Sequence, residues 1–284
     1  MKKLLFLSGI LVCMLGTSQT YAQNKIVDGA YERTNMDQMK PVPLPYVREA
    51  DVMWSKKIWR VIDLREKMNQ VLYFPTTETE GRNSLINLLL QGIRDSVITA
   101  YDARTDDEFK VPMNYEQVKE AFGATNRTRR VRNADTGEFE ETRIEGQIRS
   151  EEVMQFMVKE EWYFDKQTST LNVRIIGLCP IREYYLEGDV NHENVQRTQL
   201  FWVRYPEVRG LLASNAVLNP RNTAASMSFD DLFIKRRFSS YIVRESNVYN
   251  NRSINQYLSG KDAMRESQRI EEEIFNFEQD LWEY

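Results

Sequence analysis

The sequence contains very few residues of the two types that most often build disulfides and metal sites. Of its 284 residues, two are cysteine and one is histidine. Cys13 lies in an N-terminal leader, so the mature chain keeps only Cys179 and cannot form an intramolecular disulfide. The apolar run around Cys179 predicts a buried, inert thiol, and an intermolecular bridge is the alternative. The single histidine, His192, lies in a polar loop, which excludes a histidine-rich metal site and a second imidazole base.

The chain also lacks a surplus of basic residues and a long apolar run beyond the leader. Its formal net charge of -4 becomes -6 when Lys2 and Lys3 are removed with the leader. Nucleic acids select basic faces and anionic membranes attract polybasic segments, so we expect neither partner. No later apolar run approaches the length of a membrane span, so we expect no direct membrane insertion. With 42% hydrophobic and 11% aromatic residues, the chain can form a substantial core.

The first 22 residues have the organisation of a signal peptide. Two lysines precede the apolar run 4–16, which is too short to span a bilayer as a stable helix. Small residues end the leader, so we predict a signal peptide over residues 1–22 that is cleaved before Gln23. A lipoprotein would need a small residue just before Cys13, and Val12 stands there. The sequence therefore predicts an exported, soluble protein without a lipid anchor.

The sequence has none of the short motifs that accompany common catalytic and cofactor sites. It contains no GxSxG, P-loop, GxGxxG or HExxH pattern. Two pairs of adjacent acidic residues occur, Asp106 with Asp107 and Glu151 with Glu152. The side chains of adjacent residues point apart on a helix or strand, so neither pair forms an acid–base pair by itself. We therefore predict no enzyme activity, no cofactor, and no catalytic, cofactor-binding or metal-binding residue. A carboxylate-based hydrolase and a small-ligand-binding protein are the alternatives.

Composition divides the mature chain into an arm, a core and a terminal helix. Alternate prolines from Pro41 to Pro45 favour an extended conformation, so residues 23–50 are predicted to form a Pro-rich arm. This arm docks either on its own domain or on a neighbouring copy. Residues 51–260 are predicted to form a composite α+β core of short helices and antiparallel strands. Residues 261–284 predict an amphipathic helix, which more often packs on its own domain than on a partner. Its apolar stripe consists of Ile270, Ile274, Phe277, Leu281 and Tyr284.

Two helices of the core are predicted from their start and stop signals. Ser84 precedes the segment 85–98, whose leucines share one helical face. Asn114 caps a second helix over 115–122, and Gly123 ends it.

The strand signals of the core differ in clarity. The clearest covers residues 152–181, where apolar residues alternate, a polar turn follows and a second apolar run returns. Further strands are predicted at 71–75 and 199–205, and residues 98–103 are predicted to form either a strand or an extended exit from the preceding helix. Residues 51–69, with apolar residues between Val52 and Leu64, have a mixed pattern that favours a helix.

Residues 127–143 carry many charges in an order that predicts a hairpin. Folding about the turn at 134–136 places a basic strand against an acidic one, and such pairs are weakly stabilising. The predicted pairs are Arg132 with Glu138, Arg130 with Glu140, Arg129 with Glu141, and Val131 with Phe139. A solvated hairpin is one interpretation and a polar contact surface is the other. The acidic strand supplies its own counter-charge, which argues against a nucleic-acid patch.

A weak internal duplication is also visible. Residues 100–103 match 213–216, and residues 113–118 match 227–232, with similar residue classes. In each copy an extended segment leads through a polar loop to a capped helix. The acidic residues there favour a helix N-terminus electrostatically, which explains them without catalysis.

Four blocks of the chain are rich in aromatic and charged residues: IWRVIDLREKMNQVLYFPT at 58–76, ITAYDA at 98–103, RIIGLCPIREYY at 174–185 and SFDDLFIKRRFSSYIVRESN at 228–247. Together these blocks resemble the GldN/PorN family of gliding-motility and type IX secretion proteins. The resemblance follows the same order over most of the mature chain. It carries no catalytic residues.

The resemblance implies a structural subunit of the Bacteroidota secretion machinery in the periplasm. Copies of such a protein form a ring with an outer-membrane lipoprotein of the GldK/PorK type. The ring meets the periplasmic domain of a GldM/PorM-type motor protein. Because the chain itself lacks a lipid signal, the resemblance also implies that the lipoprotein holds it at the outer membrane.

Overall fold

The computed structural model describes most of the chain after the first part of the arm. The described residues are 39–79, 81–105, 107–124, 127–132, 139–144, 146–186, 194–218, 222 and 227–281, with only the backbone of 127–132 and 139–144. They belong to one compact unit, Asn35–Tyr284. The predicted signal peptide, Asp106, His192 and Tyr284 lie outside the described residues.

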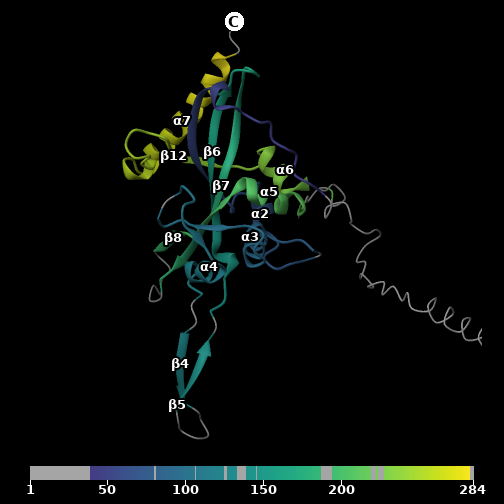
Figure 1. The fold of residues 1–284 in the computed structure, drawn as a ribbon. Coiled ribbons are helices and arrows are strands. Elements are labelled where there is room, and N and C mark those ends of the chain that lie inside the picture. Colours follow the sequence, from purple (N-terminus) through teal and green to yellow (C-terminus); the bar gives the residue numbers. More distant parts are fainter. Residues whose placement is uncertain are drawn as a thin grey trace, which may run out of the picture. The chain divides into compact units, whose positions relative to one another are not determined.

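An antiparallel sheet of eight strands organises the fold (Figure 1). Its strand order is β12-β1-β6-β7-β9-β2-β3, and β8 pairs with β7. Together with the helices this confirms the predicted α+β class with antiparallel strands. The strands are β1 (Val52–Asp63), β2 (Ala100–Asp102), β3 (Pro112–Met113), β6 (Val153–Asp165), β7 (Thr170–Tyr185), β8 (Val195–Gln199), β9 (Phe201–Arg204) and β12 (Tyr241–Glu245).

Strand β1 replaces the helix that the sequence favoured over 51–69, so that prediction was wrong. β1 pairs with β6 along its length and with β12 from Ile58 to Val61. Its first half alternates in exposure, but Ile58–Ile62 is buried without alternation. A strand that is covered on both faces loses the period of two, and the remaining apolar run resembles a helix.

The short strand predicted at 71–75 was also wrong, because a helical turn, α2 (Gln70–Tyr73), occupies this segment. The buried side chain of Asn69 fixes the turn by donating to the carbonyl oxygens of Asp63 (2.8 Å) and Ser239 (2.9 Å). An apolar run of four residues does not distinguish a strand from a helix by its pattern.

The two helices with clear capping signals are confirmed. Helix α3 (Leu85–Arg94) begins at Ser84, whose side chain accepts from the backbone of Asn87. Helix α4 (Tyr115–Ala121) begins with a reciprocal capping box between Asn114 and Gln117. Short-range hydrogen bonds of this kind depend on residues three apart, so the sequence shows them directly.

The predicted hairpin over 152–181 is confirmed as the long pair β6–β7, and the strand predicted at 199–205 as β9. Trp162 lies opposite Val173, and Phe164 lies opposite Leu171. Because these four residues alternate along their strands, they share one face of the sheet. The extended segment predicted at 98–103 contains β2.

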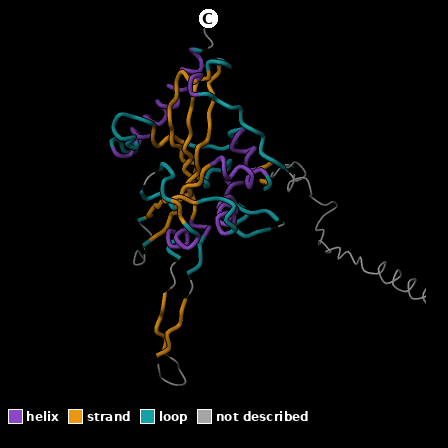
Figure 2. The backbone as a smooth tube through the Cα atoms, in the orientation of Figure 1, coloured by secondary structure: helices purple, strands orange, loops and turns teal. Residues whose placement is uncertain are grey.

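The two faces of the sheet bury different side chains. On one face, β6, β7 and β9 pack on α3, α5 (Tyr205–Ala213) and α6 (Phe229–Ile234), and Phe156 and Leu178 are buried there. The same face continues toward the β6–β7 turn, where α7 (Gly260–Asp280) covers it. Figure 2 shows these helices in purple beside the orange strands. On the other face Trp59, Cys179 and Trp202 form a smaller cluster.

The charged hairpin predicted over 127–143 is confirmed as β4 (Arg127–Arg132) and β5 (Phe139–Ile144), but its predicted register was wrong. Each residue of β4 pairs with the β5 residue one position later in the sequence than predicted. The innermost pair is Arg132 with Phe139, so six residues, 133–138, separate the two strands in the sequence. A slip of one residue changes every cross-strand partner. The observed pairs are Arg127 with Ile144, Arg129 with Thr142, Arg130 with Glu141, and Arg132 with Phe139.

The weak duplication corresponds to a repeated order of elements. β2 pairs with β3 before α4, and β10 (Ala216–Val217) pairs with β11 (Met227–Ser228) before α6. However, Ala213 ends helix α5 whereas Ala100 lies in β2. The first pair of matched segments, 100–103 and 213–216, therefore does not correspond in structure.

Candidate interaction surface

Helix α7 packs on its own domain through a narrow apolar stripe, as the spacing of its residues predicted. Ile270 and Ile274 are buried against Ile58 and Ile242 of the sheet. Phe277 of the same stripe stacks on Trp54, with ring centroids 4.6 Å apart. Most of the remaining helix surface is exposed. The helix therefore completes the core with one side and presents its other sides to partners.

A buried hydroxyl joins α7 to the end strand of the sheet. The backbone N–H of Ile242 in β12 donates to Ser267 Oγ at 3.0 Å. Backbone groups on an end strand need such partners, because an open edge pairs with other chains. Ser267 thus satisfies a donor that would otherwise face the packed helix.

We expect Ser267→Ala to lower the free energy of unfolding by about 1–3 kcal/mol, because it leaves the buried Ile242 N–H without its acceptor. Urea denaturation followed by circular dichroism measures this change. The neighbouring exposed residue provides the control, and Gln268→Ala should change stability by less than about 0.5 kcal/mol. Equal effects of the two substitutions would contradict the role of Ser267.

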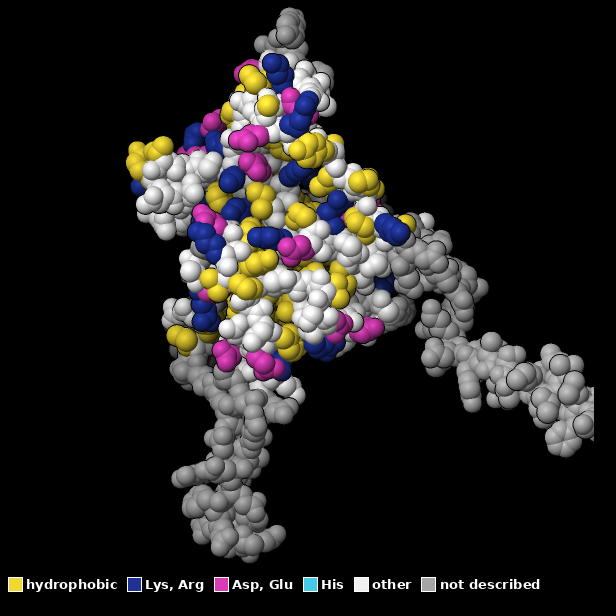
Figure 3. Space-filling view, in the orientation of Figure 1, with side chains coloured by type: hydrophobic (Ala, Val, Ile, Leu, Met, Phe, Trp, Pro, Cys, Tyr) yellow, Lys and Arg dark blue, Asp and Glu magenta, His cyan; other side chains and the backbone are white. Residues whose placement is uncertain are grey.

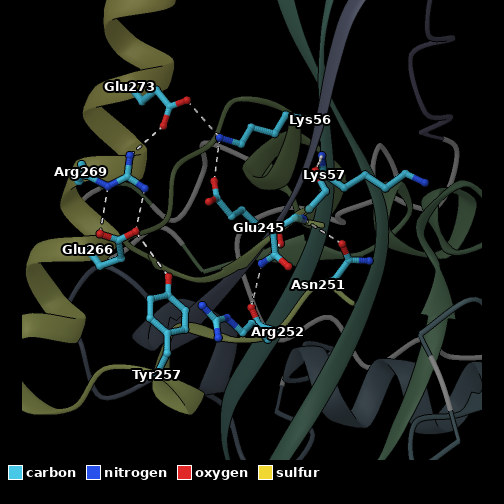
Figure 4. Close-up of polar contacts among 11 residues, drawn as sticks. Lys56, Lys57, Glu245, Asn251, Arg252, Tyr257, Glu266, Arg269 and Glu273 are labelled. Atoms are coloured by element: carbon cyan, nitrogen blue, oxygen red, sulfur yellow. Dashed lines mark hydrogen bonds and ion pairs between the residues drawn. The ribbon is translucent and has the colours of Figure 1, made fainter. Parts of the chain in front are cut away.

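A network of ion pairs also holds α7 against β1 and β12 (Figure 4). Lys56 of β1 lies 2.7 Å from Glu245 of β12 and 3.4 Å from Glu273 of α7. Arg269 pairs with Glu273 at 3.1 Å and with Glu266 at 2.7 Å. The hydrogen bonds from Arg269 lower the pKa of the Glu266 carboxyl, so it stays ionised. The network fixes the helix relative to two strands that lie far away in the sequence.

The loop 246–258 beside α7 is held by its own polar side chains. Asn247 and Asn251 bond to backbone groups within the loop. The Arg252 guanidinium lies 4.6 Å from the ring centroids of both Tyr249 and Tyr257. On this support Val248 is 90% exposed and Tyr249 is 63% exposed. Rigid, exposed apolar and aromatic side chains are typical of protein–protein contact sites.

A shallow, open groove of about 430 Å³ lies on the exposed side of α7, and all the residues that line it belong to this helix. Its lining consists of Arg269, Glu272, Glu273, Asn276, Phe277 and Asp280. Phe277 gives the groove an aromatic wall. Glu272 and Asp280 form no ion pair with any residue in the described part of the chain. The groove therefore suits a cationic side chain from a partner.

The described part of the arm lies on its own domain. A buried ion pair joins Arg209 and Asp230 (3.0 Å), and Tyr205 also donates to Asp230 (2.8 Å). Arg209 then donates to the carbonyl oxygen of Val42 at 2.6 Å, and a second guanidinium, from Arg174, bonds to the carbonyl oxygen of Pro45. These bonds use only the arm's backbone, and its side chains stay largely exposed.

The smaller cluster on the opposite face, formed by Trp59, Cys179 and Trp202, is covered by closely packed neighbouring side chains. Arg244 stacks on Trp59 at 3.9 Å from the ring centroid, and Asp107 pairs with both Arg244 and Lys159. Burial lowers the pKa of Lys159, and Asp107 opposes that shift. Phe109 closes the cluster by packing edge-on against a second tryptophan, Trp202. We assign this cluster a role in packing.

Several carboxylates in the described part of the chain are engaged in structural ion pairs. Glu160 is buried between Arg60 and Arg236, and Glu152 pairs with Arg182. In the part of the chain that the structure describes, no three histidine, cysteine or acidic side chains gather as metal ligands. Cys179 is buried, as predicted, and burial raises the pKa of its thiol far above the ordinary value.

Sequence reasoning had proposed no site residues and missed the groove on α7. The spacing of Glu272, Asn276 and Asp280 at four-residue intervals places them on one flank of a helix and could have indicated it. The pairs Lys56–Glu245 and Arg209–Asp230 carry no comparable signal, because their partners lie in separate elements. On the face drawn in Figure 3, basic and acidic side chains are interspersed rather than segregated.

Comparison with known proteins gives one finding that bears on function. The model of a family described as "Gliding motility associated protein GldN" matches residues 47–283. No curated protein matches the chain. Among the described residues, none of the helices is both long enough and apolar enough to cross a bilayer.

Proposed function

The chain belongs to the GldN family of gliding motility associated proteins, and from this membership we propose that it is a structural subunit of the type IX secretion and gliding machinery in the periplasm. Copies of the chain form a ring with an outer-membrane lipoprotein of the GldK/PorK type. The ring meets the periplasmic domain of a GldM/PorM-type motor protein. Its role is mechanical: it links an anchored lipoprotein to the motor.

The surface formed by α7 and the loop 246–258 is the observation that carries this proposal beyond family membership. Ion pairs and hydrogen bonds fix the surface, while Val248 and Tyr249 project from it. Contact residues on a rigid support lose little conformational entropy on binding. The signal peptide predicted over residues 1–22 agrees with a periplasmic location. Among the described residues, the buried carboxylates of Glu160 and Asp230 already bind arginines, which argues against the hydrolase alternative.

Assembly with the lipoprotein tests the proposal. The mature protein, residues 23–284, is purified alone and after co-expression with its GldK/PorK-type lipoprotein, and light scattering after size-exclusion chromatography gives the masses. We expect a complex many times the mass of one copy when the lipoprotein is present. A protein that stays monomeric and never binds the lipoprotein would overturn the proposal.

Two matched variants test whether the loop takes part. Val248→Ser replaces an exposed apolar side chain of the loop, which should reduce the recovered complex while leaving the unfolding curve unchanged. Val97→Ser alters another exposed apolar residue, away from this loop, and should leave both unchanged. If the two variants behave alike in assembly, the loop 246–258 is not a contact site.

A further inference from the structure

The observed register leaves β4 as a strand with little directly opposed negative charge. It carries four arginines in six residues, RTRRVR. Only Arg130 has an acidic residue, Glu141, directly opposite it. The other three arginines lie opposite isoleucine, threonine and phenylalanine. By sequence, β4 carries four arginines, and β5 carries two glutamates and one arginine, so the paired strands have a net charge of +3 (4 minus 2 plus 1).

Helix α7 has the opposite charge. Between Gly260 and Asp280 it carries seven acidic and three basic residues, a net charge of -4 (3 minus 7). Its groove combines the aromatic wall of Phe277 with two carboxylates, Glu272 and Asp280, that no described cation pairs with. Arginine suits such a site because its planar guanidinium both bonds carboxylates and stacks on aromatic rings.

We propose that the groove on α7 of one copy binds the arginine-bearing strand β4 of a second copy. The contact joins two different surfaces, so it is heterologous, and repeating it around an axis closes a ring. The inference rests on the proposed function, because it supplies the contact between copies that a ring requires. Charge complementarity also orients the copies, since strand to strand and helix to helix would place like charges together.

Charge reversal tests this contact in the complex co-purified with the lipoprotein. One variant replaces Arg127, Arg129, Arg130 and Arg132 by Glu, and the other combines Glu272→Lys with Asp280→Lys. Each alone should weaken association between copies at least about tenfold, because like charges then meet at the contact. Mixing the two variants should restore assembly, since each reversed surface again meets its opposite. Sedimentation velocity at low and high salt measures the particle masses.

The outcomes separate this inference from the proposed function. A matched control, Glu116→Lys with Glu120→Lys, makes the same charge change on exposed positions of α4 and should assemble as the wild type does. If both reversed variants assemble normally, or if mixing them restores nothing, the contact between β4 and α7 is wrong while the ring proposal stands. If the wild-type complex contains a single copy of this chain, the proposed function itself fails.

Discussion

Replacing Glu160 with alanine is expected to lower the free energy of unfolding by about 3–5 kcal/mol, because it breaks a buried ion-pair network by removing the carboxylate that pairs with Arg236 and Arg60. Glu160 is 0% exposed. It accepts hydrogen bonds from Arg236 (2.8 Å) and from the indole of Trp162 (3.1 Å), and Arg60 lies 3.4 Å away. Equilibrium unfolding in urea, followed by tryptophan fluorescence, measures the loss.

The next residue provides a matched control for this substitution. Glu161 points to the opposite face of the sheet and is half-buried. Glu161→Ala should change the free energy of unfolding by less than about 0.5 kcal/mol. If Glu160→Ala is as mild as Glu161→Ala, the buried carboxylate does not hold the two arginines in place.

Asp230→Ala is expected to cost about 3–5 kcal/mol for the same reason, and in addition to release the arm. The carboxylate of Asp230 accepts from Tyr205 and Arg209. Arg209 in turn holds the carbonyl oxygen of Val42. Without Asp230 the guanidinium is no longer positioned toward the arm. Limited proteolysis should then cut within residues 39–48 faster than in the wild-type protein.

Asp231→Ala separates the two roles of this region. Asp231 is partly exposed and pairs with Lys235 one helical turn later, which contributes about 0.3–0.5 kcal/mol. Its loss should leave the arm as resistant to protease as before. Equal cleavage rates in the Asp230 and Asp231 variants would show that the buried ion pair does not secure the arm.

The sequence predicted those elements whose signals lie within a few residues of one another. The caps at Ser84 and Asn114 and the alternation around Trp162 are of this kind, and α3, α4 and β6 follow them. Strand β1 was mistaken for a helix, because whether Ile58–Ile62 is covered on both faces depends on packing partners from distant segments. Burial by distant segments of the chain leaves no pattern in the local sequence.

The interaction surface was less predictable than the fold. The apolar stripe of α7 was visible from spacing alone, and with it the side on which the helix packs. The residues that α7 contacts could not be predicted, because the fold of the sheet brings Lys56 of β1 close to Glu273 of α7. The register of β4 and β5 was wrong by one residue, because charge pairing is too weak to fix a register when the loop can add a residue.

The pairing of β1 with β12 has a consequence for how the chain folds. Arg60 of β1 lies opposite Ile242 of β12. The two paired residues are 182 positions apart in the sequence (242 minus 60), so β1 can pair with β12 only after the intervening chain has been synthesised. Contacts across such separations form slowly, because a long loop must close before they contribute. The sheet edge therefore cannot close until β12 and the helix α7 that follows it have been synthesised. Until then β1 pairs with β6, and the backbone groups along the other side of β1 form an open sheet edge, which can pair with other chains.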